Sequence, residues 1–296
     1  MELAARRHDV LILSSEAISG IVFYHYRLKL VEHFRQRGYA IHLVLYLRDS
    51  PEFLNAAYQQ NTRMMREARS FHDYVAFTAL GSGGPRPVLR LTGRLDDRLR
   101  AAGRLHFRPY DAALREKGIE QDFVDLLNTV CRDEGTATAD APLSVRDVAT
   151  PRRLNEGCGP LQIEVSRRIA AALLERYPRR LLVQASHGQS HADQVARGIR
   201  RAGIREPSYW GFGPELYHRV REALAEENER FAQAVWERSW DAIFPPRPDE
   251  RLVSNDLVDA GTDEMRALAD RLHARIAPSI EAKVARRVAR LKPSER

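Results

Sequence analysis

Cysteine is scarce in this sequence. The chain of 296 residues contains 2 cysteines, Cys131 and Cys158, which lie far apart and form neither a CxxC pair nor a zinc-type cluster. We therefore expect neither a disulfide framework nor a bound metal. This cysteine usage fits a reducing cytoplasm.

Long hydrophobic runs are also missing. The apolar residues 10–13 follow a basic start but are far too few for the apolar part of a signal peptide, and no later segment approaches the length of a membrane span. We expect a soluble, cytoplasmic protein without a transmembrane segment. The hydrophobic content of 44% is enough for one large core or two modest ones.

Positive charge is in excess. Lys and Arg number 47 against 40 Asp and Glu, for a formal net charge of +7, and most of the positive residues are arginine. Arginine binds phosphate or sulfate through two parallel N–H groups, so an anionic partner is favoured. A basic solvated surface explains the excess equally well. Nucleic-acid binding ranks last, because the sequence shows no aromatic-basic RNA-binding element and no helix-turn-helix.

The first part of the chain reads as strand, helix, strand. Residues 10–13 are consecutively apolar, as in a buried strand, and "YAIHLVLYL" (39–47) is a second, longer one. Between them apolar residues recur at helical spacing, and Gly38 stands where a left-handed cap would end a helix. The pattern predicts a parallel βαβ unit, whose ligand sites lie beyond the carboxyl ends of its strands.

Polar residues follow both of these strands. Ser14, Ser15 and Glu16 come directly after the first, while Arg48 and Asp49 come after the second. Because parallel strands end at the same edge of a sheet, we expect these side chains to face one crevice.

The rest of the chain is predicted to be mainly helical. Helices are expected over 50–70, with Ser50 as N-cap, and over 71–80 and 87–103, and a third strand over 104–111. Beyond about residue 112 helix predominates, interrupted by a polar loop at 131–160. Residues 181–191 fit either a fourth strand or the end of a helix.

Several short motifs carry a family resemblance. The motifs are "LSSE" (13–16), "LYLR" (45–48), "AAYQQ" (56–60), "FRPYD" (107–111), "QDFVDLL" (121–127), "RRLNE" (152–156) and "ENERFAQAVW" (227–236). In their type and order they resemble the bacterial sulfotransferase family related to carbohydrate and polysaccharide sulfotransferases. The likeness covers most of the chain.

The resemblance implies a fold and an activity. The expected fold is α/β, a parallel sheet flanked by helices of the P-loop-like sulfotransferase type. One domain would span 1–296, with an α/β nucleotide-binding part at 1–130 and a mainly helical part at 131–296. The implied activity transfers a sulfuryl group from phosphoadenosine phosphosulfate (PAPS) to a hydroxyl of a saccharide or similar acceptor, with no metal. The oligomeric state is left open.

The resemblance also implies a nucleotide pocket. Arg48 would hold the 3′-phosphate of PAPS, since an arginine at a strand end followed by a helix N-terminus supplies charge and free backbone amides together. Ser14 and Ser15 would line the same pocket. The alternative for Arg48 is an ordinary ion pair or helix cap.

Acceptor binding would fall to three further residues. Glu16 is the candidate base that accepts the proton of the acceptor hydroxyl, although a solvated loop glutamate is the simpler interpretation. Arg108 and Tyr110, at the end of the third predicted strand, are the candidate acceptor ligands. An ordinary strand terminus explains them equally well.

Two features depart from the family pattern. The Lys-Thr-Gly-Thr-like loop that cradles the phosphosulfate in relatives is absent, and Ala56 stands where a serine is expected as a second 3′-phosphate ligand. Since sulfuryl transfer depends mainly on charge stabilisation, losing the loop is the larger change. Either the chain starts too far downstream or it is a degenerate relative. The second hypothesis is therefore a non-catalytic binding or scaffold protein on the same fold.

Other candidate positions favour structural roles. Tyr58 and Gln60 are expected to pack and hydrogen-bond within their helix. His187 and His191 have the spacing of metal-binding helices but lack the glutamate of H-E-x-x-H and a third ligand. Arginines recur every four residues at 90, 94 and 98 and form a basic helical edge that fits either an anionic polysaccharide or a solvated face.

Overall fold

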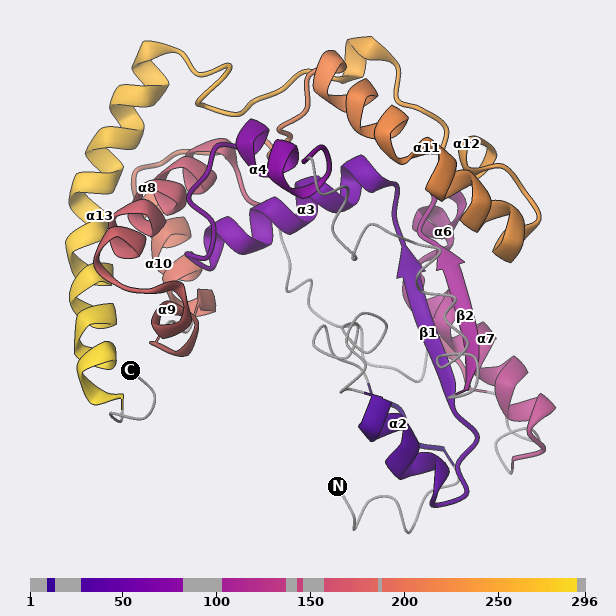
Figure 1. Cartoon of the computed structure of the whole chain (residues 1–296). Coiled ribbons are helices and arrows are strands. Elements are labelled where there is room, and N and C mark those ends of the chain that lie inside the picture. Colours follow the sequence, from indigo (N-terminus) through magenta and orange to yellow (C-terminus); the bar gives the residue numbers. More distant parts are fainter. Residues whose placement is uncertain are drawn as a thin grey trace. The chain divides into compact units, whose positions relative to one another are not determined.

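The computed structural model describes residues 10–13, 28–81, 103–136, 143–145, 157–185 and 188–291 (Figure 1). They form a mixed α/β structure that is mostly helical and contains a two-stranded parallel sheet. The chain divides into two compact units that interleave along the sequence. We call Met1–Asp49, Arg86–Leu154 and Ala225–Pro246 the sheet unit, and the remainder the helical unit. The single-domain organisation stays a prediction.

The sheet pairs β1 (His42–Leu47) with β2 (Arg104–Pro109). Both strands were predicted, and they are parallel, in a register that runs from His42 opposite Arg104 to Leu47 opposite Pro109. Side chains alternate between the two faces of a strand. One face of this sheet is therefore apolar and the other is polar.

The apolar face packs against the end of α11 (Pro214–Trp236) and against α12 (Trp240–Ile243). Phe107 and Phe231 meet edge to face, with ring centroids 5.1 Å apart. The Trp236 indole donates a hydrogen bond to the Phe107 carbonyl at 2.9 Å, which ties this helix to β2. The other buried members of this cluster are Leu47, Ala232, Trp240, Ile243 and Phe244.

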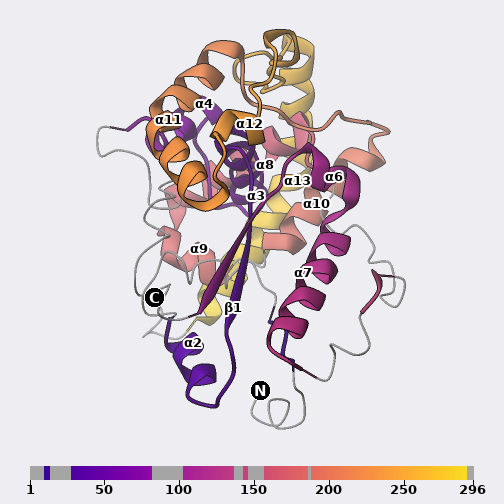
Figure 2. The ribbon, with the colours of Figure 1, turned by 90° about the vertical axis from the view of Figure 1, so that its right-hand side faces the viewer.

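The polar face carries Tyr46 and Arg108, and both contact α7 (Ile119–Asp133). Figure 2 shows α7 running beside the strands. Between β2 and α7 lies the short helix α6 (Ala112–Lys117), which the Asp111 side chain caps by accepting a hydrogen bond from the Leu114 amide.

The helical unit is built from segments that are distant in sequence. Its helices are α3 (Ser50–Arg63), α4 (Phe71–Thr78), α8 (Pro160–Arg176), α9 (Arg179–Ala185), α10 (Gly188–Arg201) and α13 (Asp263–Arg290). The first half of α11 and the short 3-10 helix η6 (Asp249–Arg251) also belong to it. Helix α8 lies at the centre and contacts α3, α9, α10 and α13. Its buried side chains include Leu161, Val165, Ile169 and Leu173.

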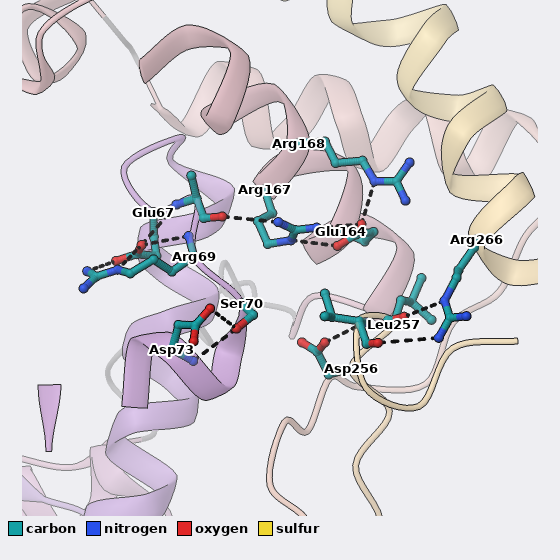
Figure 3. A network of polar contacts seen from close by, with 12 residues as sticks. Glu67, Arg69, Ser70, Asp73, Glu164, Arg167, Arg168, Asp256, Leu257 and Arg266 are labelled. Carbon is teal, nitrogen blue, oxygen red and sulfur yellow. Dashed lines mark hydrogen bonds and ion pairs between the residues drawn. The ribbon is translucent and has the colours of Figure 1, made fainter. Parts of the chain in front are cut away.

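A buried polar network crosses this helical core (Figure 3). The Glu164 carboxylate of α8 accepts two hydrogen bonds from Arg167, at 2.8 and 2.9 Å, and one from Arg168 at 2.6 Å. Arg167 also donates to the Ala68 carbonyl, in the segment between α3 and α4. Burial by itself raises the pKa of Glu164, but the bonds from the two arginines outweigh it and leave its pKa below the usual range.

One predicted strand is wrong. Residues 10–13 are not in a strand, and the Ile12 and Leu13 side chains are exposed. An apolar run becomes a strand only where a neighbouring backbone supplies hydrogen bonds, and the one strand paired with β1 among the described residues is β2. The predicted βαβ unit built on residues 10–13 is therefore not formed.

The other predicted elements in the described ranges are present, although one of them is shorter than predicted. Helix α2 (Leu28–Arg35) precedes Gly38, whose φ of 84° is left-handed as the sequence predicts. Helix α4 lies where it was expected, whereas α3 ends at Arg63 and not at residue 70. Met65, just after this end, has a left-handed φ of 57°, which a continuing helix does not allow. Residues 181–191, for which strand and helix were both open, fall in α9 and α10 wherever they are described. The helix predicted over 87–103 lies almost wholly outside the described residues.

Within the described ranges, no helix combines the length and apolar character needed to cross a membrane.

Candidate functional site

Three of the six predicted site residues lie outside the described ranges. These are Ser14, Ser15 and Glu16. The expected meeting of Glu16 with Arg48 at one sheet edge therefore stays a prediction. The other three, Arg48, Arg108 and Tyr110, all lie at the carboxyl end of the two-stranded sheet.

Arg48 is the first residue after β1, and its side chain is exposed. Its guanidinium carbon lies 4.7 Å from the centroid of the Tyr110 ring, which is a cation–π contact. Among the residues that the structure describes, no carboxylate pairs with Arg48. The backbone brings the two residues together, because the Tyr110 amide donates a hydrogen bond to the Leu47 carbonyl at 2.6 Å.

A second arginine contacts the same ring. The Arg115 guanidinium carbon lies 5.3 Å from the Tyr110 centroid, and its Nη2 is 3.4 Å from the Tyr110 carbonyl oxygen. Sequence reasoning missed Arg115. The available signal was the helix cap Asp111, because a side chain four residues after a cap lies one turn into the helix, close to the strand end. Two exposed guanidinium groups thus flank one tyrosine at the carboxyl edge of the sheet.

Arg108 is engaged by a buried carboxylate. Asp122 of α7 accepts hydrogen bonds from Nε of Arg108 at 3.0 Å, from its Nη2, and from the Tyr46 hydroxyl at 3.0 Å. The Lys117 Nζ atom lies 3.5 Å from Oδ1 of the same carboxylate. This group fixes the Arg108 guanidinium on the polar face of the sheet. Its Nη1 atom takes no part in the contact with Asp122, and the side chain is 40% exposed.

The groups around Asp122 stabilise its ionised form. Burial alone raises the pKa of Asp122, but the hydrogen bonds from Arg108 and Tyr46 outweigh it and place its pKa below the usual range. Burial and the bond to Asp122 raise the pKa of the Tyr46 hydroxyl. The carboxylate therefore stays ionised and the phenol stays protonated at neutral pH.

Asp49, next to Arg48, has a structural role. It is buried, and its Oδ1 accepts a hydrogen bond from the Trp240 indole at 3.0 Å. The bond links the end of β1 to α12. Asp49 is thus directed into the sheet unit, whereas Arg48 is exposed.

The opposite end of the polar face holds a histidine pair. His42 Nδ1 lies 2.9 Å from His106 Nε2, and His42 Nε2 lies 3.2 Å from a Glu134 carboxylate oxygen. Burial, followed by the nearby His42, lowers the pKa of His106. Arg104 and Arg108 on the same strand act in the same direction. At neutral pH the pair can therefore share a hydrogen bond without carrying two charges.

We expect this pair to make the sheet unit sensitive to mild acid. Because the folded pKa of His106 lies below its unfolded value near 6.5, the folded state binds fewer protons, and the free energy of unfolding falls as the pH drops below about 6.5. His106→Gln should reduce the loss of stability between about pH 7 and pH 5.5. Urea unfolding at the two pH values measures this. The exposed His72→Gln serves as control, and an unchanged pH dependence in His106→Gln would contradict the prediction.

The remaining sequence candidates have structural roles or lie outside the described residues. Tyr58 is buried, as expected for a packing residue, but its hydroxyl donates to the Arg69 carbonyl at 2.9 Å, beyond the end of α3 and not within the helix. Gln60 contacts the Met64 sulfur, four residues further along the chain. His191 is buried, whereas His187 is outside the described ranges. Within those ranges no group of His, Cys, Asp or Glu has a metal-binding arrangement. The arginines at 90, 94 and 98 are not described.

Comparison with known proteins assigns no family. No protein-family model matches the chain, and neither a curated protein nor a solved structure matches it. A function is therefore inferred from the residues at the sheet edge and from the motif resemblance.

Proposed function

We propose that this protein binds PAPS and transfers its sulfuryl group to a hydroxyl of a saccharide or similar acceptor, on a P-loop-like sulfotransferase fold. The exposure and the contacts of the Arg48 side chain support this proposal most. It is exposed at the carboxyl end of a parallel strand, lies against Tyr110, and has no carboxylate partner among the described residues.

The guanidinium group of Arg48 is suited to binding a phosphate. A planar cation resting on an aromatic ring loses little further freedom when it binds an anion, and its N–H groups point outward in a fixed fork. A phosphate accepts two such N–H groups at once. In the proposal Arg48 binds the 3′-phosphate, Arg115 adds positive charge from the other contact on Tyr110, and Ser14 and Ser15 complete the nucleotide pocket.

In the proposal, groups near Arg48 bind the acceptor. Nη1 of Arg108 and the Tyr110 hydroxyl would bind acceptor oxygens, and Glu16 would be the base. In the proposed step the acceptor oxygen forms a bond to sulfur while the bond between sulfur and the bridging phosphate oxygen breaks. The desulfated nucleotide PAP leaves, and the hydroxyl proton passes to Glu16. Asp122 would act as a positioning residue, because it holds Arg108.

Arg48→Ala should weaken PAP binding by about 10- to 150-fold, the equivalent of losing hydrogen bonds to a charged group worth about 1.5–3 kcal/mol. Isothermal titration calorimetry measures the change. Arg104→Ala is the matched control, since Arg104 lies on the same sheet at its amino end and is 65% exposed. Its affinity for PAP should equal that of the wild type. Equal affinity in wild type and Arg48→Ala would remove the proposed role of Arg48.

A second candidate is a nucleotide-binding protein without transferase activity. It is favoured by the sequence, which contains no Lys-Thr-Gly-Thr-like loop and has Ala56 in place of the expected serine. Incubation with sulfur-labelled PAPS and a pool of saccharides separates the two candidates. Label in the saccharide fraction would reject the second, whereas PAP binding without any transfer at high protein concentration would favour it.

A further inference from the structure

The helical unit carries an exposed basic surface on two helices. All of its arginines are solvent-exposed, and they come from the second half of α10 and from α13. We call them the α10/α13 basic surface: Arg197, Arg200, Arg201, Arg271, Arg275, Arg286 and Arg290.

The two helices lie directly against each other (Figure 1). A Cβ added to Gly198 would lie 2.5 Å from Ile276 Cδ1, so the helices approach closely at this glycine. Arg275 donates to the Gly198 carbonyl at 2.9 Å, and Lys283 donates to Gln194 at 2.6 Å. The contacts run in opposite order along the two helices. The end of α10 therefore lies beside the turn of α13 that carries Arg271.

The carboxylates of α10 and α13 do not pair with the arginines of this surface. After its first turn α13 has two carboxylates, Asp270 and Glu281, and both pair with α8, through Arg168 and Arg176 respectively. The one carboxylate of α10, Asp193, is half-buried. Of the seven arginines, none has an ion-pair partner among the residues that the structure describes. The surface therefore presents positive charge that is not neutralised by its own helices.

The arginines of α13 form a strip. At about 100° per residue Arg271, Arg275, Arg286 and Arg290 fall within a sector of about 100°, and they span about 28 Å of helix axis. The exposed residues between them are small: Pro278, Ser279 and Ala282. A linear polyanion can thus approach the helix backbone closely along the strip.

The side chains of the surface disfavour two kinds of anionic partner, a membrane and a single-stranded nucleic acid. The large hydrophobic side chains that are exposed in the described ranges all lie outside α10 and α13. The surface therefore lacks the apolar groups by which a helix inserts into a membrane and the aromatic rings on which bases stack. Guanidinium groups bind carboxylate and sulfate in the same two-pronged geometry.

We propose that the α10/α13 basic surface binds an acidic polysaccharide, through carboxylate or sulfate groups spaced along the chain. The choice of a saccharide polymer over other polyanions rests on the proposed function. The surface shares no residue with the proposed nucleotide site, because all its residues belong to the helical unit, whereas Arg48 and Tyr110 belong to the sheet unit.

Heparin and polygalacturonate, one sulfated and one carboxylated, are the probes. Binding to the full chain is measured by calorimetry from low to physiological salt. Arg271→Ala, Arg286→Ala and Arg290→Ala are combined in one variant, because these side chains make no contact on which folding depends. A second triple variant replaces Arg197, Arg200 and Arg201. Each should lower the affinity for both polymers at least tenfold and reduce the salt dependence of binding.

The control variant replaces Arg219, Arg238 and Arg251, which are exposed elsewhere and remove the same net charge. It should bind both polymers as the wild type does. An equal loss in the control would overturn the proposal, as would tighter binding of duplex DNA than of either polysaccharide at physiological salt. PAP titration of the same variants separates the two proposals. Loss of polymer binding with normal PAP affinity supports this surface, whereas a wild-type chain that binds heparin here but not PAP contradicts the proposed function alone.

Discussion

Glu164→Gln is expected to destabilise the helical unit by about 3–5 kcal/mol, the cost of removing one partner from a buried ion pair. The carboxylate is 6% exposed, and it holds Arg167 and Arg168, whose side chains are 21% and 27% exposed. The amide keeps the shape of the side chain but removes its charge. Arg167 would then be largely buried without a carboxylate partner, whereas Arg168 would keep its ion pair with Asp270. Urea unfolding followed by circular dichroism measures the loss.

The control for this change lies on the same helix. Glu175 is exposed, so Glu175→Gln should change the free energy of unfolding by less than about 0.5 kcal/mol. Acid provides a second test. Because the pKa of Glu164 is lowered by folding, its contribution is present above the unfolded value near 4.5 and is lost as the pH falls through the folded value. Glu164→Gln should lack this part of the acid sensitivity. Similar stability in the two variants would contradict the buried network.

Asp122→Asn should have the next largest effect, a loss of about 2–4 kcal/mol in the sheet unit. The carboxylate is 3% exposed and accepts from both Arg108 and Tyr46. The cost is expected to be smaller than for Glu164, because Arg108 is 40% exposed and water can partly replace its lost partner.

Asp125 provides the matched control for Asp122. It lies one turn further along α7, is 47% exposed, and pairs with Lys117 at 2.9 Å. Asp125→Asn should cost much less than Asp122→Asn, because exposed ion pairs contribute little to stability. Hydrogen exchange of the β1 and β2 amides reports the stability of the sheet unit directly. If both variants exchanged equally fast, Asp122 would not be the residue that fixes Arg108 against the sheet.

Local patterns predicted the type and position of elements whose character is set by their own residues. The helices α3 and α4 and the strands β1 and β2 were all predicted. Glu164 is three residues before Arg167 and four before Arg168, and this spacing also predicts ion pairs on one face of a helix. The sequence did not show that this group is buried, because burial depends on the segment between α3 and α4, which is distant in sequence.

The contacts of the candidate site also depend on residues that are distant in sequence. The position of Arg48 after β1 follows from the sequence, but its contact with Tyr110 depends on which strand pairs with β1. The apolar run at 10–13 has the local character of a strand and is not one. "RPY" and "QDF" were both noticed as motifs, yet the bond between Arg108 and Asp122 joins a strand to a helix and becomes visible only in three dimensions.

Local sequence was sufficient to predict the basic character of the chain, the type of most of its elements and the position of Arg48 directly after a strand. These follow from residue type and from periodicity over one or two turns. Three other features emerge only from the folded chain: the strand pairing, the contact of Arg108 with Asp122 and the proximity of the arginines on α10 and α13. Each of these depends on contacts between residues far apart in the chain, whose free energy no local pattern specifies.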